Sequence, residues 1–227
     1  MVDLAFVAAY VVHPPVLPGW AWQLDQDGSI PEVYGYAKLG AAALLLWLLG
    51  RHHASRLALG WAAAVAVVVL DDAGRLHERG GRLAAWAVHP GPALGLRPED
   101  QGEVVVLGAL ALLAALPLWH QHRRADPWSR SVSRALAPPL VLLGAAAVGL
   151  DVVHRVMAAT TGRAGVVLED GTELLLQSLV LASTMAVVTA EARSRLVAPL
   201  VPDRRWSCGP ARLPVPPSGP GRGPNAA

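Results

Sequence analysis

The chain is poor in the residues on which soluble enzymes and small secreted domains depend. Its one cysteine, Cys208, allows neither an intramolecular disulfide nor a zinc site built from several cysteines. Only 16% of its residues are charged, against about 25% in soluble domains. A net charge of +2 without a basic stripe excludes nucleic acid as a partner. Gly-rich phosphate loops, Gly-x-Ser-x-Gly elbows and dinucleotide fingerprints are absent as well.

What the chain has instead is long apolar runs, since 53% of its residues are hydrophobic. A helix needs roughly 20 mostly apolar residues to cross the hydrocarbon of a bilayer. Five runs approach or reach that length, and they predict an all-α fold, a polytopic transmembrane helix bundle with the lipid bilayer as its surroundings. The predicted spans are residues 34–49, 56–70 with a continuation to 79, 103–119, 134–157 and 169–190.

The N-terminus holds a shorter apolar run. Residues 2–12 are too few to span a bilayer before His13-Pro14-Pro15 ends the run. We interpret the run as part of a truncated sixth N-terminal span, completed by residues encoded upstream of Met1. The alternative is a helix lying on the membrane surface.

Charge patterning predicts the orientation. Alternate loops, at residues 51–56, 123–134 and 193–205, carry the arginine excess and should be cytoplasmic. Thirteen of the seventeen acidic residues fall on the opposite side. Eighteen arginines stand against one lysine, a bias typical of GC-rich bacterial genomes, so the sequence predicts a bacterial cytoplasmic (inner) membrane with the C-terminus in the cytoplasm.

Composition divides the chain into two parts. Residues 1–198 should form the transmembrane helical domain, and residues 199–227, with eight prolines, a disordered cytoplasmic tail. Within the first part, Leu-Asp-x3-Arg followed by Glu-Asp-x2-Glu occurs twice, which favours a duplicated hairpin at 56–119 and 134–190.

Acidic and histidine side chains gather at helix ends on the predicted outer side. Ionisable groups at membrane depth are costly, so they point to a functional site. Helical spacing lets carboxylates and imidazoles of three helices face one another, as in metal sites of helix bundles. We therefore predict a divalent-metal site for Zn²⁺, Mn²⁺, Fe²⁺ or Mg²⁺. Its predicted ligands are Asp72, His77, Glu78, Asp151, His154, Glu169 and Glu173, with Asp71 and Asp170 behind them.

Several interpretations of this cluster stay open. The acids could cap helix starts or pair with Arg75, Arg79 and Arg155. A metal could serve binding or sensing, or could activate water in a hydrolase acting on lipid headgroups. A small proton-coupled transporter is disfavoured because its polar groups should lie near the midplane. The sequence leaves open whether the protein is an enzyme, which proteins it contacts, and whether it forms a homo-oligomer.

Three short motifs carry a resemblance to known proteins. They are Asp25-x-Asp27-Gly28-Ser29-Ile30-Pro31-Glu32, Asp71-Asp72-x4-His77-Glu78 and Glu169-Asp170-Gly171. Together they resemble a family of uncharacterised multipass membrane proteins of bacteria, over about residues 20–190. The resemblance implies a bundle of five or six helices and no particular activity.

Overall fold

A computed structural model of the chain describes residues 2–12, 20–24, 26–89, 91 and 96–197. Over these residues the fold is all-α, as predicted, and contains no strand. The predicted tail, residues 199–227, lies outside the described part. The elements are α1 (Val2–Val12), the short 3₁₀ helix η1 (Trp20–Trp22), α2 (Ile30–His52), α3 (Arg56–Gly74), α4 (Leu76–Val88), α5 (Pro98–Arg124) and α6 (Pro127–Val197).

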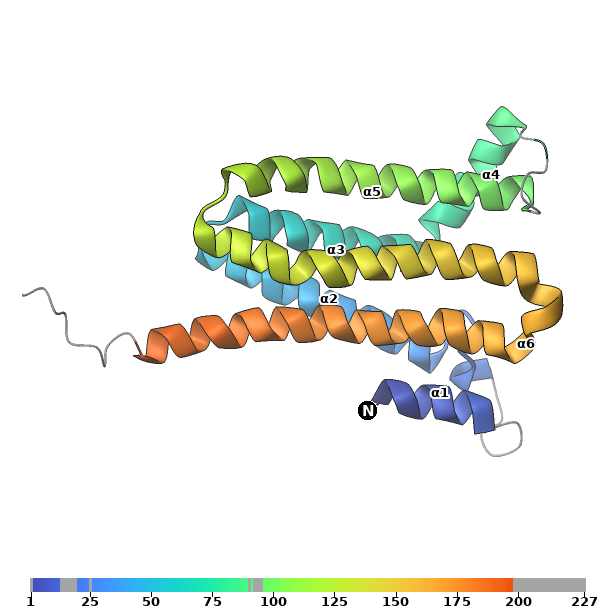
Figure 1. Cartoon of the computed structure of the whole chain (residues 1–227), viewed down its shortest axis with the longest axis horizontal. Helices are drawn as coiled ribbons and strands as arrows, with labels where there is room; N and C mark the ends of the chain where they lie inside the picture. The colour runs from blue at the N-terminus through green and yellow to red at the C-terminus, as the bar shows by residue number, and fades with distance from the viewer. Residues whose placement is uncertain (1, 13–19, 25, 90, 92–95, 198–227) are drawn as a thin grey trace, which may run out of the picture. The chain divides into compact units, whose positions relative to one another are not determined.

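Among the described residues, five helical stretches are long and apolar enough to cross a membrane, which confirms the predicted number of clear spans. Three are α2, α3 and α5, and the other two, Pro127–Met157 and Gly162–Ser194, are the halves of α6. The chain reverses between these halves at Gly162, whose φ of 48° suits glycine (Figure 1). Helical residues continue up to that turn, so the connection predicted at 155–169 is much shorter than expected. Residues 2–12 form the helix α1, too short to be a span.

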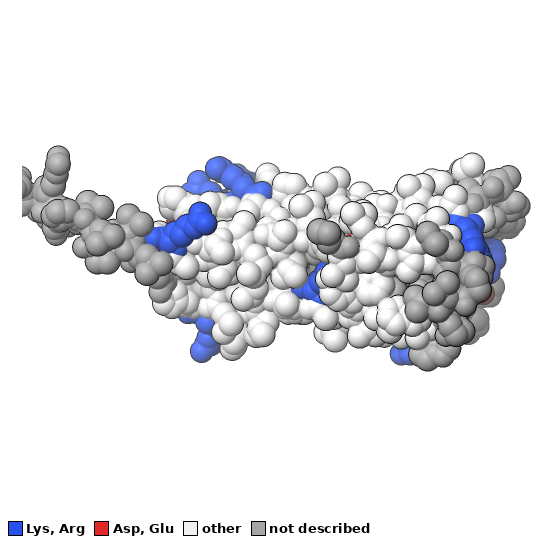
Figure 2. All heavy atoms as spheres, turned by 90° about the horizontal axis from the view of Figure 1, so that it is seen from below, with Lys and Arg blue, Asp and Glu red and all other residues white. Residues whose placement is uncertain are grey.

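The spans alternate in direction, which gives the bundle two chemically different ends. At one end α2 begins, α3 ends, α5 begins and α6 reverses its direction. We call this the acidic end. The opposite end, with the α2–α3 and α5–α6 connections, is the basic end (Figure 1). Between these ends many large apolar side chains point outward, among them Leu112, Leu113 and Val141. Figure 2 shows a face whose middle is largely free of charged residues. Such a surface is suited to lipid.

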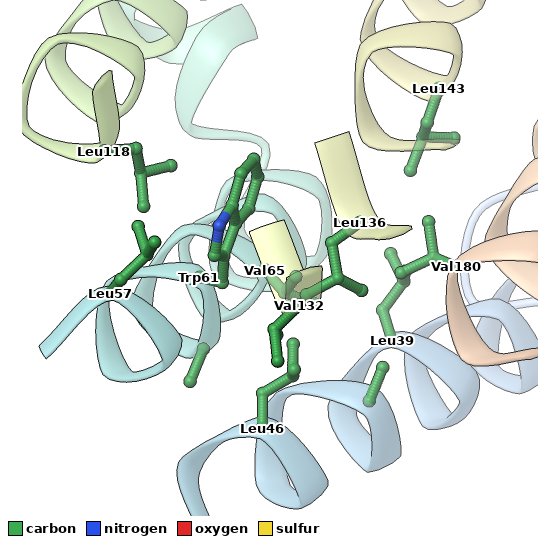
Figure 3. Close-up of a cluster of buried hydrophobic side chains, with 12 residues drawn as sticks. Leu39, Leu46, Leu57, Trp61, Val65, Leu118, Val132, Leu136, Leu143 and Val180 are labelled. Carbon is green, nitrogen blue, oxygen red and sulfur yellow. The ribbon is translucent and has the colours of Figure 1, made fainter. Parts of the chain in front are cut away.

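A buried apolar cluster holds the basic half of the bundle together. Its members belong to the basic half and the middle of the helices. They come from α2, α3, α5 and both halves of α6 and face one another (Figure 3). Leu46 of α2, Leu57 of α3 and Leu136 of α6 are at most 2% exposed. The α2–α3 connection is fixed by the hydroxyl of Ser55, which accepts the N–H of Ala58 and lies 2.7 Å from the Ser129 hydroxyl of α6.

The predicted continuation of the second span to residue 79 is wrong. α3 ends at Gly74, Arg75 takes a left-handed conformation with φ 48°, and α4 begins at Leu76 as a separate helix. The Asp71 carboxylate accepts the backbone N–H of His77 at 2.9 Å, so it satisfies one of the free donors in the first turn of α4. A helix start thus lies inside what the sequence pattern presents as one run.

α4 crosses α5 at two glycines. A Cβ on Gly81 would collide with the backbone of Glu103, and a Cβ on Gly102 would collide with the carbonyl of Gly81. Small residues let helix backbones approach this closely, as is common between membrane helices. The crossing holds α4 across the acidic end.

Candidate functional site

The sequence-predicted residues lie at the acidic end, where most of them already have partners. Arg155 of α6 is the main cation. Its Nε donates to Asp151 at 2.7 Å, its Nη2 lies 2.7 Å from Glu103, and its Nη1 contacts Asp100. Asp100 also accepts from Arg97, whose pKa is raised by that hydrogen bond. Three carboxylates from two helices are therefore neutralised together, as the charge-pairing interpretation requires.

Both predicted histidines pair with a carboxylate. His77 Nδ1 lies 3.0 Å from Asp71 Oδ2, and His154 Nδ1 contacts Glu169 of the other half of α6. Which ring nitrogen carries the proton depends on the tautomer of each histidine. In both pairs the carboxylate orients the imidazole and offers it a proton acceptor.

Two further acids lie at the edge of the site, against arginines. Glu78 is paired with Arg82 at 3.6 Å on the surface of α4. Asp27, in the turn before α2, pairs with Arg75, and both side chains are substantially exposed. Because these side chains are exposed, this edge of the site is open to water. Exposed ion pairs of this kind contribute little to stability.

At the centre of the acidic end, carboxylates meet without a paired cation. Asp72 of α3 is within electrostatic range of Glu32 of α2, and Glu173 of α6 is within range of Asp72. Tyr36 lies among all three and donates its hydroxyl proton to Glu32. In the described part of the chain neither Asp72 nor Glu173 has an ion-pair partner. We call Glu32, Tyr36, Asp72 and Glu173 the central acid group.

The polar side chains continue from this group toward the middle of the bundle. Glu169, Glu173 and Gln177, spaced four residues apart, follow one face of α6. Gln177 is buried, and its Oε1 has no hydrogen bond within the described part of the chain. This oxygen lies so close to Gly35 of α2 that a Cβ there would collide with it.

One step further in, the structure places an ion pair that the sequence analysis missed. Lys38 of α2 is 4% exposed and Asp3 of α1 is 6% exposed. The Lys38 ammonium donates to Asp3 at 2.9 Å, to the Leu174 carbonyl at 2.6 Å and to the Ser178 hydroxyl at 3.0 Å. Ser178 in turn donates to the other oxygen of Asp3 at 2.5 Å.

This ion pair lies well inside the membrane region. Lys38 is eight residues beyond Ile30, where α2 begins, which is about 12 Å at 1.5 Å per residue. All three ammonium protons are satisfied, and α1, α2 and α6 are joined by one network. The available signal was the single lysine of the chain inside an apolar run, with Asp3 inside another.

The seven predicted metal ligands are spread over several arrangements. Asp151, His154 and Glu169 have partners near the turn of α6, His77 is bound to Asp71, and Glu78 lies at the edge. Among the described residues no group of three or more His, Cys, Asp or Glu side chains is placed to hold a metal ion. A cavity of about 530 Å³ between α1 and the second half of α6 is lined mainly by apolar side chains and by none of the seven.

The basic end carries its own polar contacts. His53 stacks on Trp128 at 3.8 Å between ring centres and lies 3.2 Å from Glu191. Hydrogen bonds from the Ser129 hydroxyl and backbone N–H lower the pKa of Asp126, which precedes α6. These contacts close helix ends and stay close to water.

Comparison with known proteins adds a family to this geometry. No curated protein and no solved structure matches the chain. The profile of a domain of unknown function, DUF8692, matches residues 4–189, which include every membrane-length helix except the last few residues of α6. The protein therefore belongs to the DUF8692 family and is a membrane-embedded helix bundle of that family.

Proposed function

We propose that the protein is a cation-binding membrane module, and that Asp72 and Glu173, with Glu32, form the binding point. The observation that carries this proposal is the contrast within the acidic end. Arg155 and Arg97 neutralise Asp100, Glu103 and Asp151, whereas the central acid group has no such partner among the residues that the structure describes. Ionisable groups within a membrane are expensive and are retained where they serve a function.

Electrostatics explains why a cation is the expected ligand. Carboxylates that share a site repel one another, and the site lowers its free energy by taking up a proton or a positive ion. The Tyr36 hydroxyl stabilises only Glu32 directly. Asp72 and Glu173 come from α3 and the second half of α6, so a cation between them would also join helices that are distant in the sequence.

The predicted metal ligands enter this proposal unequally. A metal would have to draw Asp72 and Glu173 together with Glu32, and an oxygen-rich set of this kind suits Mg²⁺ or Mn²⁺. His77 could join them from α4, which would widen the choice to Zn²⁺ or Fe²⁺. Asp151, His154, Glu169 and Glu78 would serve only after leaving their present partners. A proton needs one carboxylate and no rearrangement. A hydrolase acting on lipid headgroups would depend on the same metal.

The experiment removes one carboxylate of the central acid group and records the sign of the effect. The variants are Glu173→Gln and Asp72→Asn, and the control is Asp27→Asn, which alters an exposed pair at the same end. Purified protein in nanodiscs is assayed for bound metal, for melting temperature with and without chelator, and for the infrared band of a protonated carboxylic acid.

Each outcome decides the proposal. If a metal binds, Glu173→Gln lowers its occupancy and abolishes the stabilisation that the metal gives, because binding to the folded state adds stability. If a proton binds, the carboxylic acid band disappears in Glu173→Gln or Asp72→Asn and persists in Asp27→Asn. If neither signal exists and both neutral variants are simply more stable, the acids only repel one another and the proposal is wrong.

We also propose that the acidic end faces away from the cytoplasm, because arginines concentrate at the other end and short basic loops stay in the cytoplasm. A reporter inserted after Arg124 should then be cytoplasmic, and one inserted after Gly91 external. The reverse result would place the central acid group in contact with the cytoplasm.

A further inference from the structure

α4 differs from the other helices of the bundle in direction and in pattern. It leaves the end of α3 at a steep angle and crosses α5, so it does not follow the direction of either helix (Figure 1). With 13 residues it is too short to span a bilayer. Its charged residues Glu78, Arg79 and Arg82 gather on one side, and a side with Leu76 and Leu83, at i and i+7, adjoins it next to Arg79. The helix is thus amphipathic.

One face of α4 is covered and another is bare. Gly81 and Ala85 are buried against α5, the helix that α4 crosses. Leu83 is 65% exposed and Trp86 is 72% exposed, with Leu76 half exposed on the same face. Large apolar side chains this exposed require an explanation, because monomeric soluble surfaces seldom group them.

The position of α4 relative to the membrane supplies that explanation. α3 leaves the apolar region at Gly74 and α5 enters it at Pro98, so the intervening helix lies at the level where the spans end. That level is the headgroup region, where tryptophan is enriched and amphipathic helices lie in the plane of the membrane. Lipid is present there at all times, whereas a protein partner would have to displace it.

The charge on the exposed face is also suited to phospholipid. Arg79 lies between Leu83 and Trp86 around the helix, is exposed, and has no ion-pair partner among the described residues. Arg82 differs, because Glu78 already pairs with it. An arginine between apolar groups can extend its guanidinium to a phosphate while its stem covers acyl chains.

We infer that α4 is a phospholipid-docking helix. Leu76, Leu83 and Trp86 rest on the acyl chains next to the headgroups, and the Arg79 guanidinium binds lipid phosphate, with preference for anionic headgroups. The inference depends on the membrane placement of the bundle and not on cation binding at the central acid group. The proposed lipid-binding surface lies at the acidic end, the same end of the bundle as the central acid group.

The first experiment locates the exposed face of α4. Full-length protein with Cys208→Ser receives a single cysteine, Leu83→Cys or Trp86→Cys, or Gln26→Cys as a control in the exposed turn at the same end. A bimane label at 83 or 86 should be quenched by lipids brominated near the headgroup and protected from aqueous iodide. The label at 26 should show the reverse. Iodide quenching at all three positions would overturn the inference, and so would protection that appears only as copies of the chain associate.

The second experiment tests the role of Arg79 by native mass spectrometry in detergent with added phosphatidylglycerol or phosphatidylcholine. Loss of one arginine at a membrane surface should weaken binding of the anionic lipid roughly fivefold. Arg79→Gln should therefore lose most of the preference for phosphatidylglycerol, and the paired control Arg82→Gln should keep it. Equal losses in both variants would show a general charge effect and reject a phosphate site at Arg79.

Discussion

At the basic end, Leu46, Leu57 and Leu136 fill the space between helices with apolar side chains, whereas at the acidic end the same helices bring carboxylates, imidazoles and arginines together. Packing in the basic half requires no particular partner, because one apolar surface fits another of similar shape. In the acidic half each charge needs a specific partner. The basic half therefore stabilises the bundle through packing, whereas stability in the acidic half depends on which charged groups are paired.

This difference bears on the kind of function that the protein can have. The polar side chains run from the acidic end through Glu173 and Gln177 to Lys38, and there the apolar cluster begins. The inside of the bundle is thus rich in ionisable groups toward one side of the membrane. Toward the other side it is mainly apolar, with a few buried hydroxyls such as those of Ser133 and Thr184. A site that opens to one side suits binding or sensing better than conduction through the bundle.

The largest effect should come from breaking the Lys38–Asp3 pair. Lys38→Met leaves a buried carboxylate without its cation, and the free energy of unfolding should fall by about 3–5 kcal/mol. The double variant Lys38→Met with Asp3→Leu removes both charges and should be much closer to the natural protein. Reversible unfolding in mixed detergent micelles measures each value. The single variant Asp3→Leu completes the comparison. If the double variant lost as much free energy of unfolding as Lys38→Met and Asp3→Leu lose in sum, the two residues would not act as a pair.

The apolar half should respond to volume and not to charge. Leu136→Ala removes a fully buried side chain from the cluster in Figure 3, and a cavity of this kind costs about 3 kcal/mol. Leu112→Ala, at a position that is 62% exposed toward lipid, should cost far less. The same unfolding assay compares them, and similar losses would show that the cluster does not hold the basic half together.

A smaller loss should separate two arginines that the sequence makes equivalent. Arg155 binds three carboxylates, whereas Arg75 pairs only with the exposed Asp27. Arg155→Gln should therefore cost about 2 kcal/mol, because charged groups lose their partners at a partly buried site. Arg75→Gln should cost less than about 1 kcal/mol. Equal losses would mean that Arg155 holds its carboxylates no more tightly than a surface pair does.

The contrast between these arginines shows what the sequence could predict. Apolar runs predict the spans and their number, and the scarce acids mark the acidic end, because both signals are local. The partner of a charge is not a local property. Arg155 reaches Asp100, 55 residues away, and the repeat Leu-Asp-x3-Arg gives Arg75 and Arg155 the same motif with different neighbours. The duplicated hairpin itself remains a prediction.

Two other features were hidden for different reasons. The break at Arg75 depends on a left-handed residue and on the capping of α4 by Asp71, and neither interrupts the apolar pattern. Lys38 and Asp3 are single charges within apolar segments, so they count against a span when hydropathy is averaged. Their contact joins α1 to α2 only in three dimensions. The central acid group was predicted in part, since Asp72 and Glu173 were among the proposed ligands and Glu32 and Tyr36 were not.

The smallest effect should lie at the basic end, where the polar contact is close to water. Asp126 caps α6, because its carboxylate accepts the Ser129 hydroxyl and, at 3.0 Å, the Ser129 backbone N–H. Both hydrogen bonds lower the pKa of Asp126. Asp126→Ala should lower the free energy of unfolding by about 1 kcal/mol. A carboxylate with a lowered pKa stabilises the folded state above the pH at which it titrates in the unfolded chain, about 4. The difference between natural protein and variant should therefore be constant from neutral to mildly acidic pH, and should shrink as the pH falls through the lowered pKa. A difference that disappeared near neutral pH instead would assign the effect to another group and would contradict this role of the Asp126 carboxylate.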